Sequence, residues 1–183
     1  MQRNIELKMR YPDPQRAHQV ARELGAAPHA VERQRDTYFC TRTGRLKLRQ
    51  AWLHDAGSSA VDAAQPGRGE LLWYRRDDDP QPRPSDYELI PVENAERLRV
   101  TLGQALGVTV EVVKTRAIYL HENVRIHIDE VDGLGSFLEF EAIVDAACDD
   151  RTARAKVDRL IAAFGVTAED IIAVSYADLA RPG

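Results

Sequence analysis

The sequence has little cysteine and no long apolar run. Its 183 residues include only Cys40 and Cys148, too few for a disulfide framework or a cysteine zinc cluster. No apolar stretch reaches the length that a membrane-spanning helix needs, and residues 1–6 lack the apolar core of a signal peptide. We therefore expect a cytoplasmic protein with no membrane partner.

The chain also has no excess of basic residues. The chain has 25 Lys and Arg residues against 29 Asp and Glu residues, for a net charge of −4. A general nucleic-acid binder presents a basic surface, so we expect no nucleic-acid partner. This balance still permits a locally basic pocket. The five histidines show no spacing such as His-x-x-x-His, so no zinc site is predicted.

The pattern of polar and apolar residues predicts an α+β protein with about eight strands and three or four helices. Strands are expected at residues 4–10, 35–41, 45–52, 70–76, 110–115, 117–121, 124–131 and 137–144. Helices are expected at 15–24, 94–106, 151–164 and 168–179. Residues 54–69, rich in Ala, Ser, Gly and Asp, are expected to form a loop, and the proline-rich residues 77–84 a connector.

Most of the expected strands carry charged residues two positions apart, and therefore on one face. The pairs are Glu6 and Lys8, Lys47 and Arg49, Lys114 and Arg116, and Glu139 and Glu141, with Tyr74 and Arg76 at the same spacing and Arg125 and Asp129 four positions apart on one face. The simplest interpretation is the solvated face of a half-buried antiparallel sheet. The alternative is the interior of a barrel, because bases outnumber acids and the acids gather in the first strand and the last hairpin.

A barrel of about eight strands has an interior wide enough for side chains or one small ligand. If that interior is lined with cations, something anionic has to balance the charge. Arginine and lysine together suit phosphate oxygens. Clustered carboxylates beside a phosphate suit Mg²⁺ or Mn²⁺, which prefer oxygen ligands and bridge phosphates. The charges therefore predict a polyphosphate ligand with a divalent cation.

Short motifs in a fixed order point to a known family. The first strand contains Asn-Ile-Glu-Leu-Lys at residues 4–8, and further motifs follow at 36–39, 46–49, 70–76, 114–116, 125–141 and 175–179. Together they resemble the CYTH superfamily of triphosphate-tunnel proteins, whose first strand carries Glu-x-Glu-x-Lys. Residues 125–141 resemble the class IV adenylyl cyclase-like branch. Asn4 stands where the family has its first glutamate, which puts the metal affinity in doubt more than the fold.

The resemblance implies an eight-stranded antiparallel β-barrel, or tunnel, with helices packed outside. It spans residues 3–180, so we expect residues 1–183 to form a single domain. It implies triphosphate binding by Lys8, Lys47, Arg49, Arg76, Lys114, Arg116 and Arg125. It implies Mg²⁺ or Mn²⁺ binding by Glu6, Glu139 and Glu141, with Asp129 nearby. His127 shares the alternation of Arg125 and Asp129, so we expect it to face the tunnel.

Two reactions share this machinery, and the residues do not separate them. Attack of the ribose 3′-oxygen of ATP on the α-phosphorus gives cyclic AMP and pyrophosphate, and the likeness of residues 125–141 favours this cyclase. Attack of water on the terminal phosphorus gives a triphosphatase acting on tripolyphosphate, thiamine triphosphate or a nucleotide. Lys8 is the candidate general base. A non-catalytic phosphate-ligand sensor is a third hypothesis, which the retained Glu6, Glu139 and Glu141 disfavour. A homodimer is compatible with the sequence.

Overall fold

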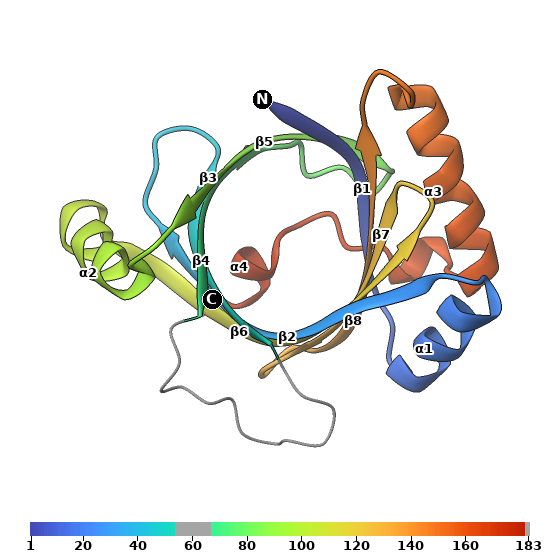
Figure 1. Ribbon diagram of the computed structural model, residues 1–183, viewed down its shortest axis with the longest axis horizontal. Coiled ribbons are helices and arrows are strands. Elements are labelled where there is room, and N and C mark those ends of the chain that lie inside the picture. Colours follow the sequence, from blue (N-terminus) through green and yellow to red (C-terminus); the bar gives the residue numbers. More distant parts are fainter. Residues whose placement is uncertain (54–66, 182–183) are drawn as a thin grey trace.

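The computed structural model describes residues 1–53 and 67–181, and it contains a closed antiparallel barrel in the strand order β1-β5-β4-β3-β2-β6-β7-β8 (Figure 1). The strands are β1 (Gln2–Arg10), β2 (Ala27–Phe39), β3 (Arg45–Leu53), β4 (Arg68–Arg75), β5 (Arg83–Val92), β6 (Val108–His121), β7 (Val124–Val131) and β8 (Gly135–Val144). The helices are α1 (Pro14–Glu23), α2 (Ala95–Leu106), α3 (Asp150–Phe164) and α4 (Tyr176–Leu179), with a 3-10 turn η1 (Ala168–Asp170). The barrel with outer helices expected from the sequence is confirmed.

The main apolar core lies outside the barrel wall. Helices α1 and α3 pack on β1, β7 and β8, while α2 packs on β2, β3 and β4 (Figure 1). Ile5, Leu7, Ile126 and Phe140 are fully buried beneath α1 and α3. Because side chains alternate along a strand, the residues between them point into the barrel. The wall therefore separates an apolar outer layer from a polar interior.

Helix boundaries follow the capping chemistry that the sequence offers. Asp13 caps α1 by accepting a 2.9 Å hydrogen bond from the backbone N–H of Arg16, as expected for an N-cap aspartate. Asn94 caps α2 in the same way through Arg97. Helix α3 ends at Gly165, whose φ of 67° is left-handed and suits glycine. No helix in the described ranges is long and apolar enough to cross a membrane.

Eight strands are expected and eight are observed, but two differences between the sets offset each other. Residues 110–115 and 117–121 belong to one long strand, β6, instead of two. Strand β5 was missed, because Pro84 and Pro91 are unfavourable within a strand. It nevertheless pairs with β1 and β4 and closes the barrel.

Two further expectations need correction. Strand β2 begins at Ala27, well before the expected residue 35. The pattern does not predict this first half, because its polar side chains lie on both faces and leave no alternation with apolar residues. The helix expected at 168–179 is the short turn η1 followed by extended chain and α4. Of the loop expected at 54–69, residues 54–66 lie outside the described part of the chain.

Candidate functional site: a charged tunnel

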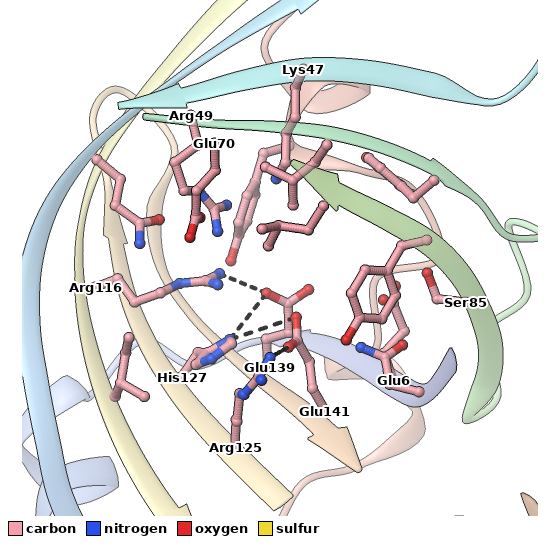
Figure 2. A pocket seen from close by; sticks show the side chains of 18 of the residues that line it. Glu6, Lys47, Arg49, Glu70, Ser85, Arg116, Arg125, His127, Glu139 and Glu141 are labelled. Atoms are coloured by element: carbon pink, nitrogen blue, oxygen red, sulfur yellow. Dashed lines mark hydrogen bonds and ion pairs between the residues drawn. The ribbon is translucent and has the colours of Figure 1, made fainter. Parts of the chain in front are cut away.

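A cavity of about 360 Å³ runs inside the barrel, and the charged faces predicted from the sequence line it. Ten of the predicted site residues contribute to its wall: Glu6, Lys8, Lys47, Arg49, Arg76, Lys114, Arg116, Arg125, Glu139 and Glu141 (Figure 2). The charged faces are therefore the inside of a barrel and not the solvated side of an open sheet. The eleventh predicted residue, Asp129, lies fully buried beside this wall.

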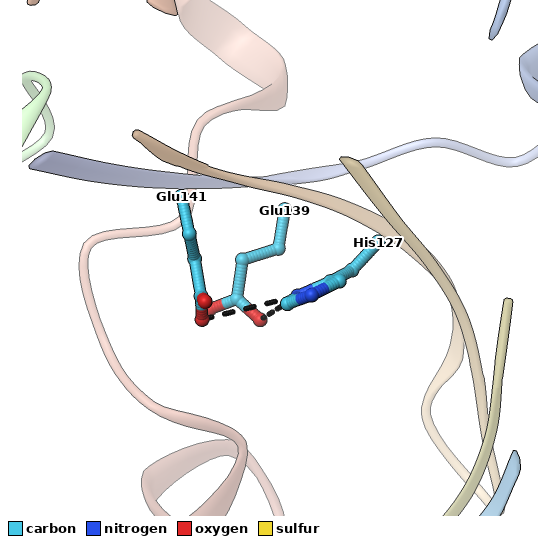
Figure 3. A group of neighbouring side chains, drawn as sticks. All are labelled: His127, Glu139 and Glu141. Atoms are coloured by element: carbon cyan, nitrogen blue, oxygen red, sulfur yellow. Dashed lines mark ion pairs between the residues drawn. The ribbon is translucent and has the colours of Figure 1, made fainter. Parts of the chain in front are cut away.

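Carboxylates gather where β1, β7 and β8 adjoin. His127, Glu139 and Glu141 each present a ligand atom within 4.8 Å of the others (Figure 3). The Nδ1 atom of His127 lies 3.7 Å from Glu139 Oε2 and 3.8 Å from Glu141 Oε1. Glu6 directly faces Glu141 in the β1–β8 pairing. We call Glu6, His127, Glu139 and Glu141 the acidic corner.

The electrostatics of the acidic corner suit a cation. Burial raises the pKa of Glu6 even though Arg76 lies beside it, and the charges of Glu139 and Glu141 add to the rise. Two buried polar atoms here, His127 Nδ1 and Asn4 Oδ1, have no hydrogen-bond partner among the described residues. Buried polar atoms are normally paired. The carboxylate oxygens of the acidic corner fit Mg²⁺ or Mn²⁺, and Asn4, two residues before Glu6 on β1, lines the same cavity.

Three cations surround one buried carboxylate on the opposite wall. Asp36, which is 1% exposed, accepts two 2.8 Å hydrogen bonds from Arg49 and one of 3.0 Å from Lys47. Lys114 Nζ lies 3.8 Å away. We call Asp36, Lys47, Arg49 and Lys114 the cation cluster. Burial opposes the ionisation of Asp36, but the three cations hold the pKa of its carboxyl well below the usual value.

Neighbouring cations and burial lower the pKa values of the two lysines in the cation cluster, which favours their neutral amine forms. Burial and Arg49 lower the pKa of Lys47 to about 8, although Asp36 opposes the shift. Burial and Arg116 lower the pKa of Lys114 to about 7. A phosphate group would add negative charge here and favour the ammonium forms. Three cations share the single negative charge of Asp36, so the cluster can bind a further anion.

Helix α4 lies across one end of the tunnel and places Tyr176 inside it (Figure 1). The Tyr176 hydroxyl donates a 2.8 Å hydrogen bond to Asp129, and its ring lies 4.0 Å from Lys8 Nζ and 4.9 Å from Lys114 Nζ. The segment is fixed to the barrel by Arg76, which donates to the backbone carbonyl of Ala173 at 3.0 Å. This end is consequently closed and rich in positive charge.

The hydrogen-bond partners of Asp129 are Arg116 and Tyr176, and it does not belong to the acidic corner. Both of its oxygens accept 2.6 Å hydrogen bonds from Arg116, and one also accepts the Tyr176 hydroxyl. Arg116 donates further to Glu139 at 2.6 Å. In this arrangement Asp129 orients Arg116 toward the tunnel, and its role as a metal ligand stays a prediction. Lys8 also contacts Glu139, with Nζ 3.3 Å from Oε1.

Several interior residues were missed by the sequence reasoning. Glu32, Gln34, Glu70 and Tyr87 line the cavity, and Arg83 is buried on β5 with its Nε and one Nη without partners among the described residues. The alternation in β2 that ends at Tyr38 would have placed Asp36, Gln34 and Glu32 inside. The β5 residues gave no such signal, because that strand was not expected.

A family model for the CYTH domain matches residues 2–176. The chain belongs to the CYTH family. CYTH proteins are usually enzymes that act on triphosphates, and the triphosphate-tunnel enzymes among them generally depend on divalent metals. No curated protein sequence matches the chain.

Solved structures share the CYTH barrel at low sequence identity. PH1012 of Pyrococcus horikoshii OT3 is 21% identical with a TM-score of 0.77, covering 96% of this chain and 98% of its own. A candidate adenylate cyclase from Vibrio parahaemolyticus is 18% identical with a TM-score of 0.69, covering 96% of both chains. HpAC1 from Hippeastrum, a candidate adenylyl cyclase described as having a dominant triphosphatase activity, is 13% identical with a TM-score of 0.54, covering 91% and 89%. These likenesses establish the fold.

Proposed function

We propose that this CYTH protein is a divalent-metal-dependent enzyme that binds ATP by its triphosphate inside the tunnel and converts it to cyclic AMP and pyrophosphate. The observation that supports this reaction is the order of charged groups along the tunnel. Lys8 and Lys114 lie against Tyr176 at the closed end. Glu141, two residues from Glu139 on β8, lies farther from that end and pairs with Arg125.

That order favours one direction of triphosphate binding over the other. The terminal phosphates, which carry most of the charge, are best matched by the cation cluster, because Lys8 and Arg76 already pair with Glu139 and Glu6 of the acidic corner. The organic group then points toward the open end. The α-phosphorus, which joins it to the chain of phosphates, would lie beside Glu139 and Glu141. Attack of the ribose 3′-oxygen on that phosphorus forms the cyclic phosphodiester of cyclic AMP and breaks the bond to pyrophosphate, which leaves.

The side chains supply positioning and neutralisation of charge, which are the main needs of phosphoryl transfer. Lys47 and Arg49 would hold oxygens of the leaving pyrophosphate, and Arg116 would contact the phosphate nearest Glu139. Glu6, Glu139 and Glu141 would hold Mg²⁺ or Mn²⁺, which would supply positive charge to offset the charge that develops on the leaving group. The ion pair of Lys8 with Glu139 suits a phosphate-binding ammonium, and its role as general base stays a prediction.

Hydrolysis of the terminal phosphate is the second candidate. It is supported by the structural similarity to HpAC1 from Hippeastrum, which is described as having a dominant triphosphatase activity. The same tunnel would serve it if the triphosphate bound in the reverse direction, with its terminal phosphorus at the acidic corner.

Product analysis separates the two reactions. Purified protein is incubated with ATP or with tripolyphosphate, in Mg²⁺ or Mn²⁺, and cyclic AMP, pyrophosphate and orthophosphate are measured separately. We expect equal amounts of cyclic AMP and pyrophosphate from ATP. Orthophosphate without cyclic AMP would replace the cyclase by the triphosphatase. Binding without turnover of either compound would favour the sensor hypothesis.

Triphosphate affinity should depend on pH through Lys114 and Lys47. Phosphate favours the ammonium forms of Lys114, whose pKa is about 7 in the free tunnel, and of Lys47, whose pKa is about 8. Affinity should therefore be retained below pH 7, begin to fall through Lys114, and fall further above pH 8 through Lys47. The limiting slope for one such group is about tenfold per pH unit. Isothermal titration with tripolyphosphate between pH 7 and 9.5 measures this. A Lys47→Arg variant should give a flatter profile above pH 8, and identical profiles would contradict the assignment.

A further inference from the structure

The end of the tunnel away from α4 has a different chemistry from the closed end. Strand β2 runs from one end of the tunnel to the other. Tyr38 packs with Tyr176 at the closed end. Glu32 lies six residues earlier on the same face, roughly 20 Å along the strand. Around this end the cavity is lined by Glu32, Gln34, Glu70, Leu72, Leu89 and Ile118. Toward the opening the wall therefore gains carboxylates and apolar side chains, next to the bases Arg68 and Arg125 that also line the cavity.

Gln34 presents an unpaired acceptor to this part of the cavity. It is 1% exposed, and its Nε2 donates a 2.6 Å hydrogen bond to Glu32 Oε2. That bond fixes the orientation of the amide, because a carboxylate can only accept from the nitrogen. Gln34 Oε1 is left without a partner among the described residues. A buried acceptor of this kind is costly unless a ligand supplies a donor.

The surrounding charges select against a bare polyphosphate. Among the described residues, Glu32 and Glu70 form ion pairs with Arg68 alone, at 3.4 Å and 3.2 Å, and the Arg68 side chain is 60% exposed. An exposed partner is screened by water and neutralises a carboxylate weakly. Glu32 faces Arg116 across the β2–β6 pair, but this guanidinium group is already bound to Asp129. Glu70 faces Arg49 across the β3–β4 pair, and Arg49 is already bound to Asp36. A chain of phosphates reaching this region would therefore meet two carboxylates whose neighbouring cations are occupied elsewhere. A flat apolar group with N–H donors would satisfy Gln34 Oε1 and cover Leu72 and Ile118.

We propose that Gln34, with Glu32 and Glu70, forms the subsite for the organic group of the substrate, and that it selects a heterocycle bearing an amino donor over inorganic tripolyphosphate. The inference rests on the proposed function for the direction in which the triphosphate binds. Gln34 is a specificity residue here. It contacts the organic group and leaves the phosphates to the cation cluster.

The test compares two ligands in binding, so that it does not depend on turnover. Dissociation constants for α,β-methylene ATP and for tripolyphosphate are measured by isothermal titration on wild-type protein and on Gln34→Met, a near-isosteric variant without the acceptor. We expect the variant to bind α,β-methylene ATP about tenfold more weakly, as for the loss of one buried hydrogen bond, and tripolyphosphate within about twofold of wild type. Thermal unfolding of both proteins verifies that the variant folds.

A second variant tests the role of charge in the opposite direction. Glu70→Gln removes a negative charge from the opening and should strengthen tripolyphosphate binding severalfold. Equal weakening of both ligands by Gln34→Met, or no change in either, would overturn the inference while leaving the proposed function standing. Failure of both ligands to bind wild-type protein would overturn both.

Discussion

Replacing Glu139 and Glu141 together with glutamine is expected to lower metal-dependent turnover of ATP by about a thousandfold or more. The two side chains approach His127 within 4 Å and supply most of the negative charge of the acidic corner. Glutamine keeps their size but not their charge, so a divalent cation would lose its strongest ligands. A residual rate from positioning by the basic residues alone would remain.

The matched control for the double variant is Glu130→Gln. Glu130 lies on the same hairpin but is exposed on the outside of the barrel, so turnover should stay within about twofold of wild type. Tripolyphosphate binding without metal should survive in the double variant, because the cation cluster is intact. Retention of more than about a tenth of the wild-type rate, with the same metal dependence, would contradict the metal assignment.

Replacing Asp36 with asparagine is expected to lower the free energy of unfolding by about 3–5 kcal/mol, the usual cost of removing one partner from a buried ionic group. The change leaves Lys47, Arg49 and Lys114 close together without the carboxylate that they share. For a chain of this length the melting temperature should fall by roughly 10 °C. Thermal unfolding monitored by circular dichroism measures the shift.

The destabilisation of Asp36→Asn should be reversible by ligand. Tripolyphosphate would replace the missing anion, so its stabilising effect should be larger in the variant than in wild type. Asp132→Asn is the control, because Asp132 pairs with Arg33 on the surface and such exposed pairs contribute at most about 1 kcal/mol. Equal melting shifts for the two variants, or equal stabilisation by tripolyphosphate of Asp36→Asn and wild type, would show that Asp36 does not hold the cation cluster together.

The inward faces of most strands could be predicted because their charges alternate with apolar residues that the outer helices cover. Glu6 and Lys8 lie between Ile5, Leu7 and Met9, which are all fully buried, and the same alternation places Glu139 and Glu141 inside. Here local periodicity and the tertiary structure agree. The sequence was sufficient for β1 and β8 because each of these strands has one apolar face.

The missed features depend on contacts between distant segments. Strand β5 is recognisable only from its pairing with β1 and β4, since its prolines argue against a strand. The motif at 36–39 was recognised, but the role of Asp36 follows from Arg49, which faces it across the β2–β3 pairing. Likewise, a helix of four residues gives no signal that it will place Tyr176 in the tunnel. Sequence periodicity identifies which face of a strand a residue occupies, but it does not identify the residue that it contacts on another strand.

The most direct test of the central claim is the distance from bound metal to each phosphorus of the ligand. Trace Mn²⁺ is added to the protein with α,β-methylene ATP, and the paramagnetic relaxation of the three ³¹P resonances is compared. With the α-phosphorus at the acidic corner and the terminal phosphates among the cations, the α resonance should relax fastest, and the effect should vanish in the Glu139→Gln, Glu141→Gln variant. Fastest relaxation of the terminal phosphorus would reverse the binding direction and contradict the cyclase proposal.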